Sequence, residues 1–200
     1  MLLIALCISL FSLPVMAEQG GYEPSAGSLE VRIAEHSRLS SEIRSLAQKS
    51  AWKGVDRNYD RIARLRVEMS WEDHVYGAHA ASELGEIAET RARLFAAVQI
   101  RPEKGLIDWL WELDHSYGSV QLKGVEGAVL EAGPLPLDPV QRRSIEQAIT
   151  SCAETGSFEG MIPVGLYRFD GHDFSVEYGE EIALGTPQEA SHRRFLRGTD

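Results

Sequence analysis

His74 and His79 form the closest histidine pair in this chain, and histidines of this kind could bind a metal or move a proton. Their spacing of five residues places them on different sides of a helix, whereas helical zinc sites use a spacing of four. Glu72, Asp73 and Glu83 lie nearby in the sequence, but the pattern specifies no third ligand. The spacing therefore predicts packed or surface histidines and no metal site.

Acidic side chains and tryptophans crowd a helix expected over residues 103–117. Asp108 and Glu112 lie one turn apart on either side of Trp109. Glycoside hydrolysis needs two carboxylates that converge on a cleft, and neighbours on one helix do not demonstrate a cleft, so we interpret them as a solvated acidic face. Trp109 lies off the apolar stripe of this helix. It is therefore either a core residue or a partly exposed one that covers the junction with the next domain.

The remaining residues do not indicate catalysis. The sequence has no glycine-rich phosphate loop, and no motif gives Cys152 or any serine a histidine partner. We therefore expect no catalytic residues, no cofactor and no metal, and we assign only a possible interaction surface. Its members are Trp109, Asp108, Glu112, His74 and His79.

The N-terminus has the pattern of an export signal. Residues 2–15 are nearly all apolar, and Val15-Met16-Ala17 resembles a signal-peptidase site, although no Lys or Arg precedes Arg32. A buried N-terminal helix is the alternative. We expect a signal peptide over residues 1–17, a flexible leader over 18–27 and a polar tail over 185–200, and no later apolar run is long enough to span a bilayer. The mature protein would be periplasmic or secreted.

The net charge limits the kinds of partner, and the cysteine content limits the possible disulfides. The formal net charge of −10 argues against nucleic acid, because phosphate binding depends on a basic surface. After removal of the signal peptide one cysteine remains, Cys152, so an intramolecular disulfide is impossible. Its helical spacing with Ile145 and Ala148 predicts a buried thiol, and pairing with another chain is the alternative.

Residues 28–117 have the periodicity of amphipathic helices. Ser70 stands three residues before Asp73, a capping-box-like start for a helix that Gly85 ends. Further helices are expected at 52–66, 86–99 and 103–117. The stripe of the first helix comprises Leu29, Ile33, His36, Leu39, Ile43 and Leu46.

The composition changes at Gly118, where short β-branched and aromatic runs begin between glycines and prolines. One helix interrupts them: Asp138 and Pro139 supply an N-cap and a first helical residue, and this helix is expected over residues 139–153. Asp170-Gly171 between two alternating runs predicts a two-residue hairpin turn. In that register Phe169 faces His172 and Tyr167 faces Phe174. The predicted buried face comprises Tyr167, Phe169, Phe174, Val176 and Tyr178.

Two helices of the N-terminal part align with each other at a constant offset of 35 residues. The aligned positions are Trp52, Val55, Tyr59 and Ile62 against Ile87, Thr90, Leu94 and Ala97. This spacing, with the segment from Gly85-Glu86-Ile87 through Ala97 to Pro102, resembles the tetratricopeptide repeat of ~34 residues. The resemblance covers residues 30–117, and it implies antiparallel helical hairpins that present a face to a protein partner. His74 departs from the pattern, because tetratricopeptide units usually have Trp or another large residue there.

The C-terminal part is similar to the PEGA-type or prealbumin-like β-modules of exported bacterial proteins. The segments that carry this similarity are 118–122, 127–130 and 162–167. The helix at 139–153 is an insertion that those modules lack. The similarity implies binding or wall-associated work and no catalysis.

We therefore expect an α+β protein with antiparallel, tetratricopeptide-like helical hairpins over residues 28–117 and a small antiparallel β-domain with one inserted helix over 118–184. The expected function is a non-catalytic interaction or scaffold protein of the bacterial cell envelope with a protein partner. The alternatives are a module whose β-domain binds a cell-wall glycan or peptide, and an envelope hydrolase. Because two repeats are fewer than such arrays normally need, the β-domain is expected to support the helices.

Overall fold

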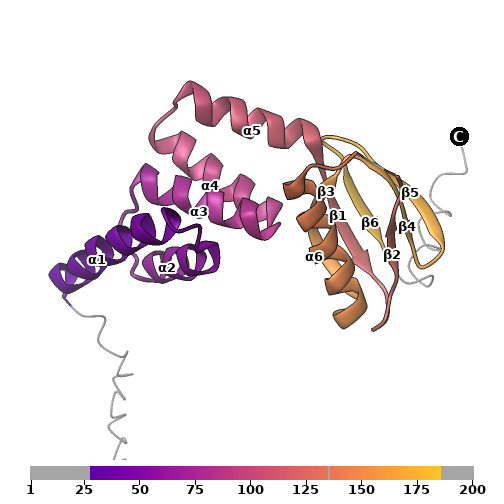
Figure 1. The fold of residues 1–200 in the computed structure, drawn as a ribbon, viewed down its shortest axis with the longest axis horizontal. Coiled ribbons are helices and arrows are strands. Elements are labelled where there is room, and N and C mark those ends of the chain that lie inside the picture. The colour runs from indigo at the N-terminus through magenta and orange to yellow at the C-terminus, as the bar shows by residue number, and fades with distance from the viewer. Residues whose placement is uncertain (1–27, 135, 186–200) are drawn as a thin grey trace, which may run out of the picture.

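The computed structural model describes residues 28–134 and 136–185 (Figure 1). The predicted signal peptide, the leader and residues 186–200 of the predicted tail lie outside this part of the chain. The described residues form an α+β protein, in which a series of helices precedes two small sheets with one inserted helix, as the sequence predicts. None of the described helices combines the length and apolar character that a membrane span requires.

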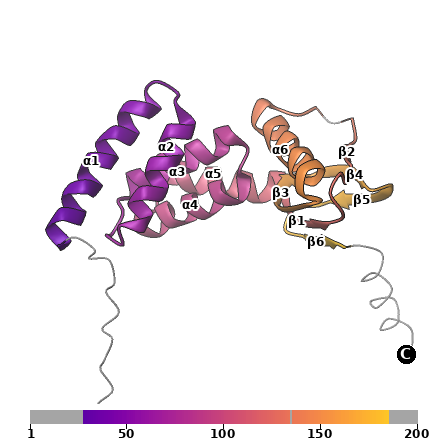
Figure 2. The ribbon, with the colours of Figure 1, turned by 90° about the horizontal axis from the view of Figure 1, so that it is seen from below.

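The helical part is a succession of helices joined by short connections, each packed on the next along the chain, and α1 also contacts α3 (Figure 2). Short connections make sequential helices antiparallel neighbours, which gives the predicted hairpins. The helices are α1 (Leu29–Ala47), α2 (Trp52–Arg64), α3 (Trp71–Leu84), α4 (Ile87–Ile100) and α5 (Lys104–Ser116).

Local capping signals set both ends of α3 as predicted. The Ser70 side chain accepts a hydrogen bond from the Asp73 amide, and the Asp73 carboxylate accepts one from the Ser70 amide, so α3 begins with a capping box. Gly85 ends α3 in the left-handed conformation, with φ of 85°. This glycine also touches the inserted helix, because a Cβ at Gly85 would lie 2.8 Å from the carbonyl carbon of Arg143.

The burial pattern of α2 recurs in α4 at the offset of 35 residues. The buried residues of α2 are Val55, Asn58 and Ile62, and their counterparts Thr90, Arg93 and Ala97 are all buried in α4. The two helices therefore turn corresponding faces inward, as expected for equivalent elements of successive hairpins.

The prediction that the apolar stripe of the first helix faces the core is wrong for the start of α1. Leu39 and Ile43 are buried, but Leu29 and Ile33 are 56% and 46% exposed. The reason is that the first turns of α1 extend past the helices that cover its second half (Figure 1).

The C-terminal part contains two three-stranded sheets, with strand orders β3-β1-β6 and β2-β4-β5. β6 runs parallel to β1, so the expectation of a wholly antiparallel β-domain is wrong for this pair. After β5 the chain leaves the second sheet and enters the first beside β1 in the same direction. The elements are β1 (Tyr117–Lys123), β2 (Leu130–Ala132), α6 (Pro139–Thr155), β3 (Ser157–Pro163), β4 (Gly165–Phe169), β5 (His172–Val176) and β6 (Glu181–Leu184).

The predicted hairpin is confirmed in register and turn type. Tyr167 pairs with Phe174 and Phe169 pairs with His172, while Asp170 and Gly171 have φ of 47° and 81°, as a type I′ turn requires. Tyr178 departs from the prediction, because β5 ends at Val176 and the Tyr178 side chain is 64% exposed.

One core lies between the two sheets and α6, and it includes the buried Cys152, as predicted. A second cluster joins the helical part to the β-domain, since Met161 of β3 and Tyr117 of β1 pack with residues of α3, α4 and α5. The helical part therefore packs against the β-domain through this cluster. The buried members of this junction cluster are Ala78, Ile87, Leu94, Leu113, Tyr117 and Met161.

Candidate binding groove

The structure separates the two histidines singled out above. Nδ1 of His74 lies 3.0 Å from the Tyr59 hydroxyl and is hydrogen-bonded to it. Burial lowers the pKa of His74; the Asp73 carboxylate opposes this change and the Arg93 guanidinium adds to it. His74 therefore braces α3 against α2.

The His79 ring packs against the Trp109 ring, with centroids 4.6 Å apart, so these two predicted surface residues do lie together. Loss of water around the imidazole lowers the pKa of His79, and Glu83 opposes this change. Trp109 is half-buried and packs against the junction cluster, in agreement with the second of its two interpretations. Within residues 28–134 and 136–185 no group of three His, Cys, Asp or Glu side chains is arranged to hold a metal.

The predicted acidic side chains of α5 lie on the surface. Asp108 forms an ion pair with Lys104, and Glu112 is exposed. A neighbour on the same helix, Asp114, pairs with Arg91 of α4. The five residues of the predicted interaction surface therefore fall into three separate places: His74 beside α2, the contact of His79 with Trp109, and the solvated face of α5.

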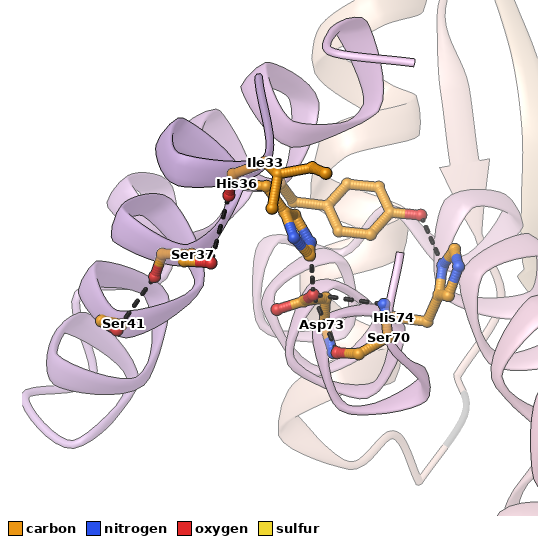
Figure 3. A network of polar contacts seen from close by, with 8 residues as sticks. Ile33, His36, Ser37, Ser41, Ser70, Asp73 and His74 are labelled. Carbon is orange, nitrogen blue, oxygen red and sulfur yellow. Dashed lines mark hydrogen bonds and ion pairs between the residues drawn. The ribbon is translucent and has the colours of Figure 1, made fainter. Parts of the chain in front are cut away.

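A buried polar network lies between α1 and α3 (Figure 3). Asp73 is 2% exposed, and its Oδ2 accepts hydrogen bonds from Ser70 Oγ at 2.8 Å and from His36 Nε2 at 3.0 Å. The serine hydroxyl thus donates to a carboxylate and forms no hydrogen bond with a described histidine, which is not the arrangement of an activated nucleophile. The network fixes the start of α3 on α1.

Arg93 of α4 has a largely buried guanidinium, with a side chain only 7% exposed. Its Nη1 donates to Asp56 Oδ1 at 2.7 Å and to the Gly77 carbonyl at 3.0 Å. The guanidinium also lies over the Tyr59 ring, 4.1 Å from the centroid. Its Nε forms no hydrogen bond with any described residue and is 3.9 Å from Glu89.

A cavity of about 420 Å³ opens beside Arg93, between α2 and α4 of the helical part and α6 and β3 of the β-domain. Its walls carry five carboxylates and one guanidinium, that of Arg93. The five carboxylates belong to Asp56, Asp60, Glu86, Glu89 and Glu159.

The carboxylates of this cavity are not fully compensated by cations. Burial raises the pKa of Glu86, and the nearby charges of Asp56, Glu89 and Asp60 raise it further, against the opposing effect of Arg93. A bound cationic group would relieve this repulsion between the carboxylates.

A second cavity of about 370 Å³ continues the first one across the sheet. Glu159, Gly160 and Met161 of β3 line both cavities. The second cavity adds Gln121 of β1, Glu181 of β6 and a second guanidinium, that of Arg91, which forms an ion pair with Asp114. We call the two together the junction groove; it runs from α2 and α4 across β3 and β1 to β6.

Exposed aromatic rings form a separate feature at the end of α5. The ring of His115 stacks between Trp111, with a centroid distance of 3.9 Å, and Tyr178, with a centroid distance of 5.3 Å. Trp111 is 62% exposed and Tyr178 is 64% exposed. This ring stack presents two large apolar rings to solvent.

Sequence reasoning missed the junction groove, although one signal pointed to it. The offset of 35 residues aligns Arg93 with Asn58, and a charged residue at an inward position of an amphipathic helix needs partners. The acidic pair Asp56 and Asp60, one turn apart on α2, supplies them.

Comparisons of the chain with protein-family models, curated proteins and solved structures find no match.

Proposed function

We propose that this chain is a non-catalytic interaction module of the bacterial cell envelope, which binds a basic segment of a protein partner in the junction groove. The pattern of an export signal over residues 1–17 supports the location. The successive helical hairpins support protein binding, because short helical arrays present extended surfaces to partners.

One observation carries the proposal: five carboxylates face a single guanidinium in a cavity between the helical part and the β-domain. Arg93 is hydrogen-bonded to Asp56 and also forms ion pairs with Asp60 and Glu89, so one guanidinium is shared by three carboxylates and the cavity keeps an excess of negative charge that can receive a cation. Lysine and arginine side chains match this site in charge, and electrostatic complementarity favours both encounter and selectivity.

The test is titration with a fluorescent peptide of alternating Lys and Val residues, followed by anisotropy. The groove variant Glu86→Gln, Glu89→Gln, Glu159→Gln keeps the Asp56–Arg93 pair and removes three charges. Since exposed pairs contribute ~0.2–1 kcal/mol each, we expect about tenfold weaker binding and a smaller salt dependence. The matched control, Asp108→Asn, Glu112→Gln, Glu177→Gln, removes the same charge elsewhere; equal losses in both variants would leave only nonspecific attraction.

A second candidate function is binding of a cell-wall glycan at the ring stack of Trp111, His115 and Tyr178. Exposed stacked rings favour it, because sugar rings pack on aromatic faces and amphipathic aromatic side chains make good binding anchors. In co-sedimentation with insoluble peptidoglycan, Trp111→Ala with Tyr178→Ala should release the protein. The control Phe95→Ala removes a ring that is 49% exposed on α4 and should not.

The third candidate, an envelope hydrolase, gains one feature from the groove. Glycosidases pair a carboxylic acid of raised pKa with a second carboxylate, and the pKa of Glu86 is raised. Binding remains the proposal because Glu89 and Glu159 are exposed, which leaves them in water rather than in an enclosed active site. Release of soluble fragments from peptidoglycan that Glu86→Gln abolishes would replace the proposal with hydrolysis.

A further inference from the structure

β3 is an edge strand within the described part of the chain, because it pairs with β1 on one side and with no described strand on the other. One hydrogen bond just beyond the end of β3 shows which of its residues bond to β1: the Val164 amide donates to the Ser116 carbonyl at 3.0 Å. In an antiparallel pair, hydrogen-bonded positions alternate. The main-chain groups of Ile162, Gly160 and Phe158 therefore bond to β1.

The alternate residues, Glu159 and Met161, direct their amides and carbonyls away from β1. No described residue forms a hydrogen bond with these four main-chain groups. Ser157, the next residue of the same parity, differs, because its carbonyl accepts hydrogen bonds from Ser151 and Thr155. The unpaired part of the edge is therefore confined to Glu159 and Met161.

This unpaired edge lies in the junction groove, since Glu159 and Met161 line both of its cavities. The carboxylates of Glu86, Glu89 and Glu159 stand around it, and the buried Arg93 has an Nε without a hydrogen-bond partner among the described residues. Main-chain donors and acceptors thus lie beside an excess of negative charge.

We propose that an extended basic segment of the protein partner adds to the free edge of β3 as a further strand. In strand addition, main-chain hydrogen bonds supply affinity and alternate side chains supply selectivity. An edge without a partner is a template for such pairing, and the charge of the groove selects lysine or arginine on the side chains that face it. This inference rests on the proposed function and specifies its geometry.

Hydrogen exchange on the full chain tests the edge directly. The amides of Glu159 and Met161 should exchange rapidly in the protein alone and slow by at least tenfold with the Lys-Val peptide. Asp173 and Ser175 are the internal control, because they occupy the corresponding outward positions of β5, an edge strand of the other sheet, and should not change. Slow exchange of Glu159 and Met161 in the protein alone, as coverage by the chain itself or by a second copy would give, overturns the inference.

Two N-methylated peptides separate this inference from the proposed function. One carries N-methyl groups on the odd residues and the other on the even residues, so only one of them blocks the amides that face β3. Because N-methylation removes the N–H donors that would bond to β3, we expect one peptide to bind about tenfold more weakly and the other to match the parent. If the two N-methylated peptides bind with equal affinity, strand addition is wrong. The proposed function fails separately if the groove variant binds the unmodified peptide as tightly as the wild-type chain does.

Discussion

The ring of Tyr59 occupies the space that a side chain at Gly77 would need. A Cβ at Gly77 would lie 2.7 Å from Cε2 of Tyr59 and closer still to Cδ2. The missing side chain lets α3 approach α2, and the same ring then lies under Arg93 and holds His74 by its hydroxyl. A glycine in the middle of α3 thus positions the arginine that lines the junction groove.

Gly77→Ala should destabilise the protein, although alanine is the better helix former. Overpacking of this kind costs about 1–3 kcal/mol, which exceeds the ~1 kcal/mol gained in helix propensity. Gly105→Ala is the matched control, because a Cβ at this helical glycine meets nothing within 4 Å. Denaturant unfolding should show a loss for Gly77→Ala and no loss for Gly105→Ala; a stabilised Gly77→Ala variant would contradict the close contact.

Gly171→Val should damage the hairpin through its backbone alone. The residue has φ of 81°, which valine rarely adopts, yet a Cβ there meets no atom within 4 Å. We expect a loss of about 1–3 kcal/mol in the free energy of unfolding, the usual cost of a strained backbone conformation. Gly171→Asn is the control and should lose less, since asparagine tolerates the left-handed region. Equal losses for valine and asparagine would show that φ at this position does not set the stability.

Elements whose signals are local could be predicted from the sequence. Asp170-Gly171 fixes both the turn and the register of its hairpin, because positive φ at both positions is a property of those two residues. The capping box of Ser70 and Asp73 is likewise contained in four consecutive residues.

Features that depend on distant residues could not be predicted. The parallel pairing of β6 with β1 joins Ser119 to Glu181, and nothing near either residue encodes that partner. Tyr178 has an apolar ring at an alternating position, but β5 ends at Val176, and the ring lies at the surface, where it stacks on His115. The junction groove has the same origin, since it exists only where the helical part meets β3.

Stability should fall as the pH drops below about 6.5, because the pKa values of His74 and His79 are both lowered from 6.5 in the folded protein. As the pH falls, the two histidines take up protons in the unfolded chain before they do so in the folded protein. Their contribution to the free energy of unfolding is therefore fully present above the unfolded pKa and is lost as the pH falls through their pKa values in the folded protein. In unfolding titrations between about pH 7.5 and 5, His74→Gln with His79→Gln should give a smaller decline than the wild-type chain. Parallel curves for the two proteins would contradict this assignment.

Met161→Ala should weaken the helical part and the β-domain together. The Met161 side chain belongs to β3 and is 9% exposed, but it packs in the junction cluster with Ala78 and Ile87. Truncation of a buried methionine costs about 2–5 kcal/mol, and a cluster shared by both parts should transmit this loss to each. Helix loss followed by circular dichroism and labelling of the buried Cys152 thiol in the core of the β-domain should report one coincident transition, shifted as a whole to lower denaturant.

The control for this experiment is Leu166→Ala, which removes an equally apolar side chain of the β-domain that is 69% exposed. Surface substitutions of this kind usually change stability by less than ~0.5 kcal/mol, so its transition should coincide with that of the wild-type chain. Two separate transitions in Met161→Ala, with only the β-domain shifted, would mean that the helices are stable without the sheet. The junction groove would then lie between independently folding parts, and peptide binding should be lost at the denaturant concentration that unfolds the first of them.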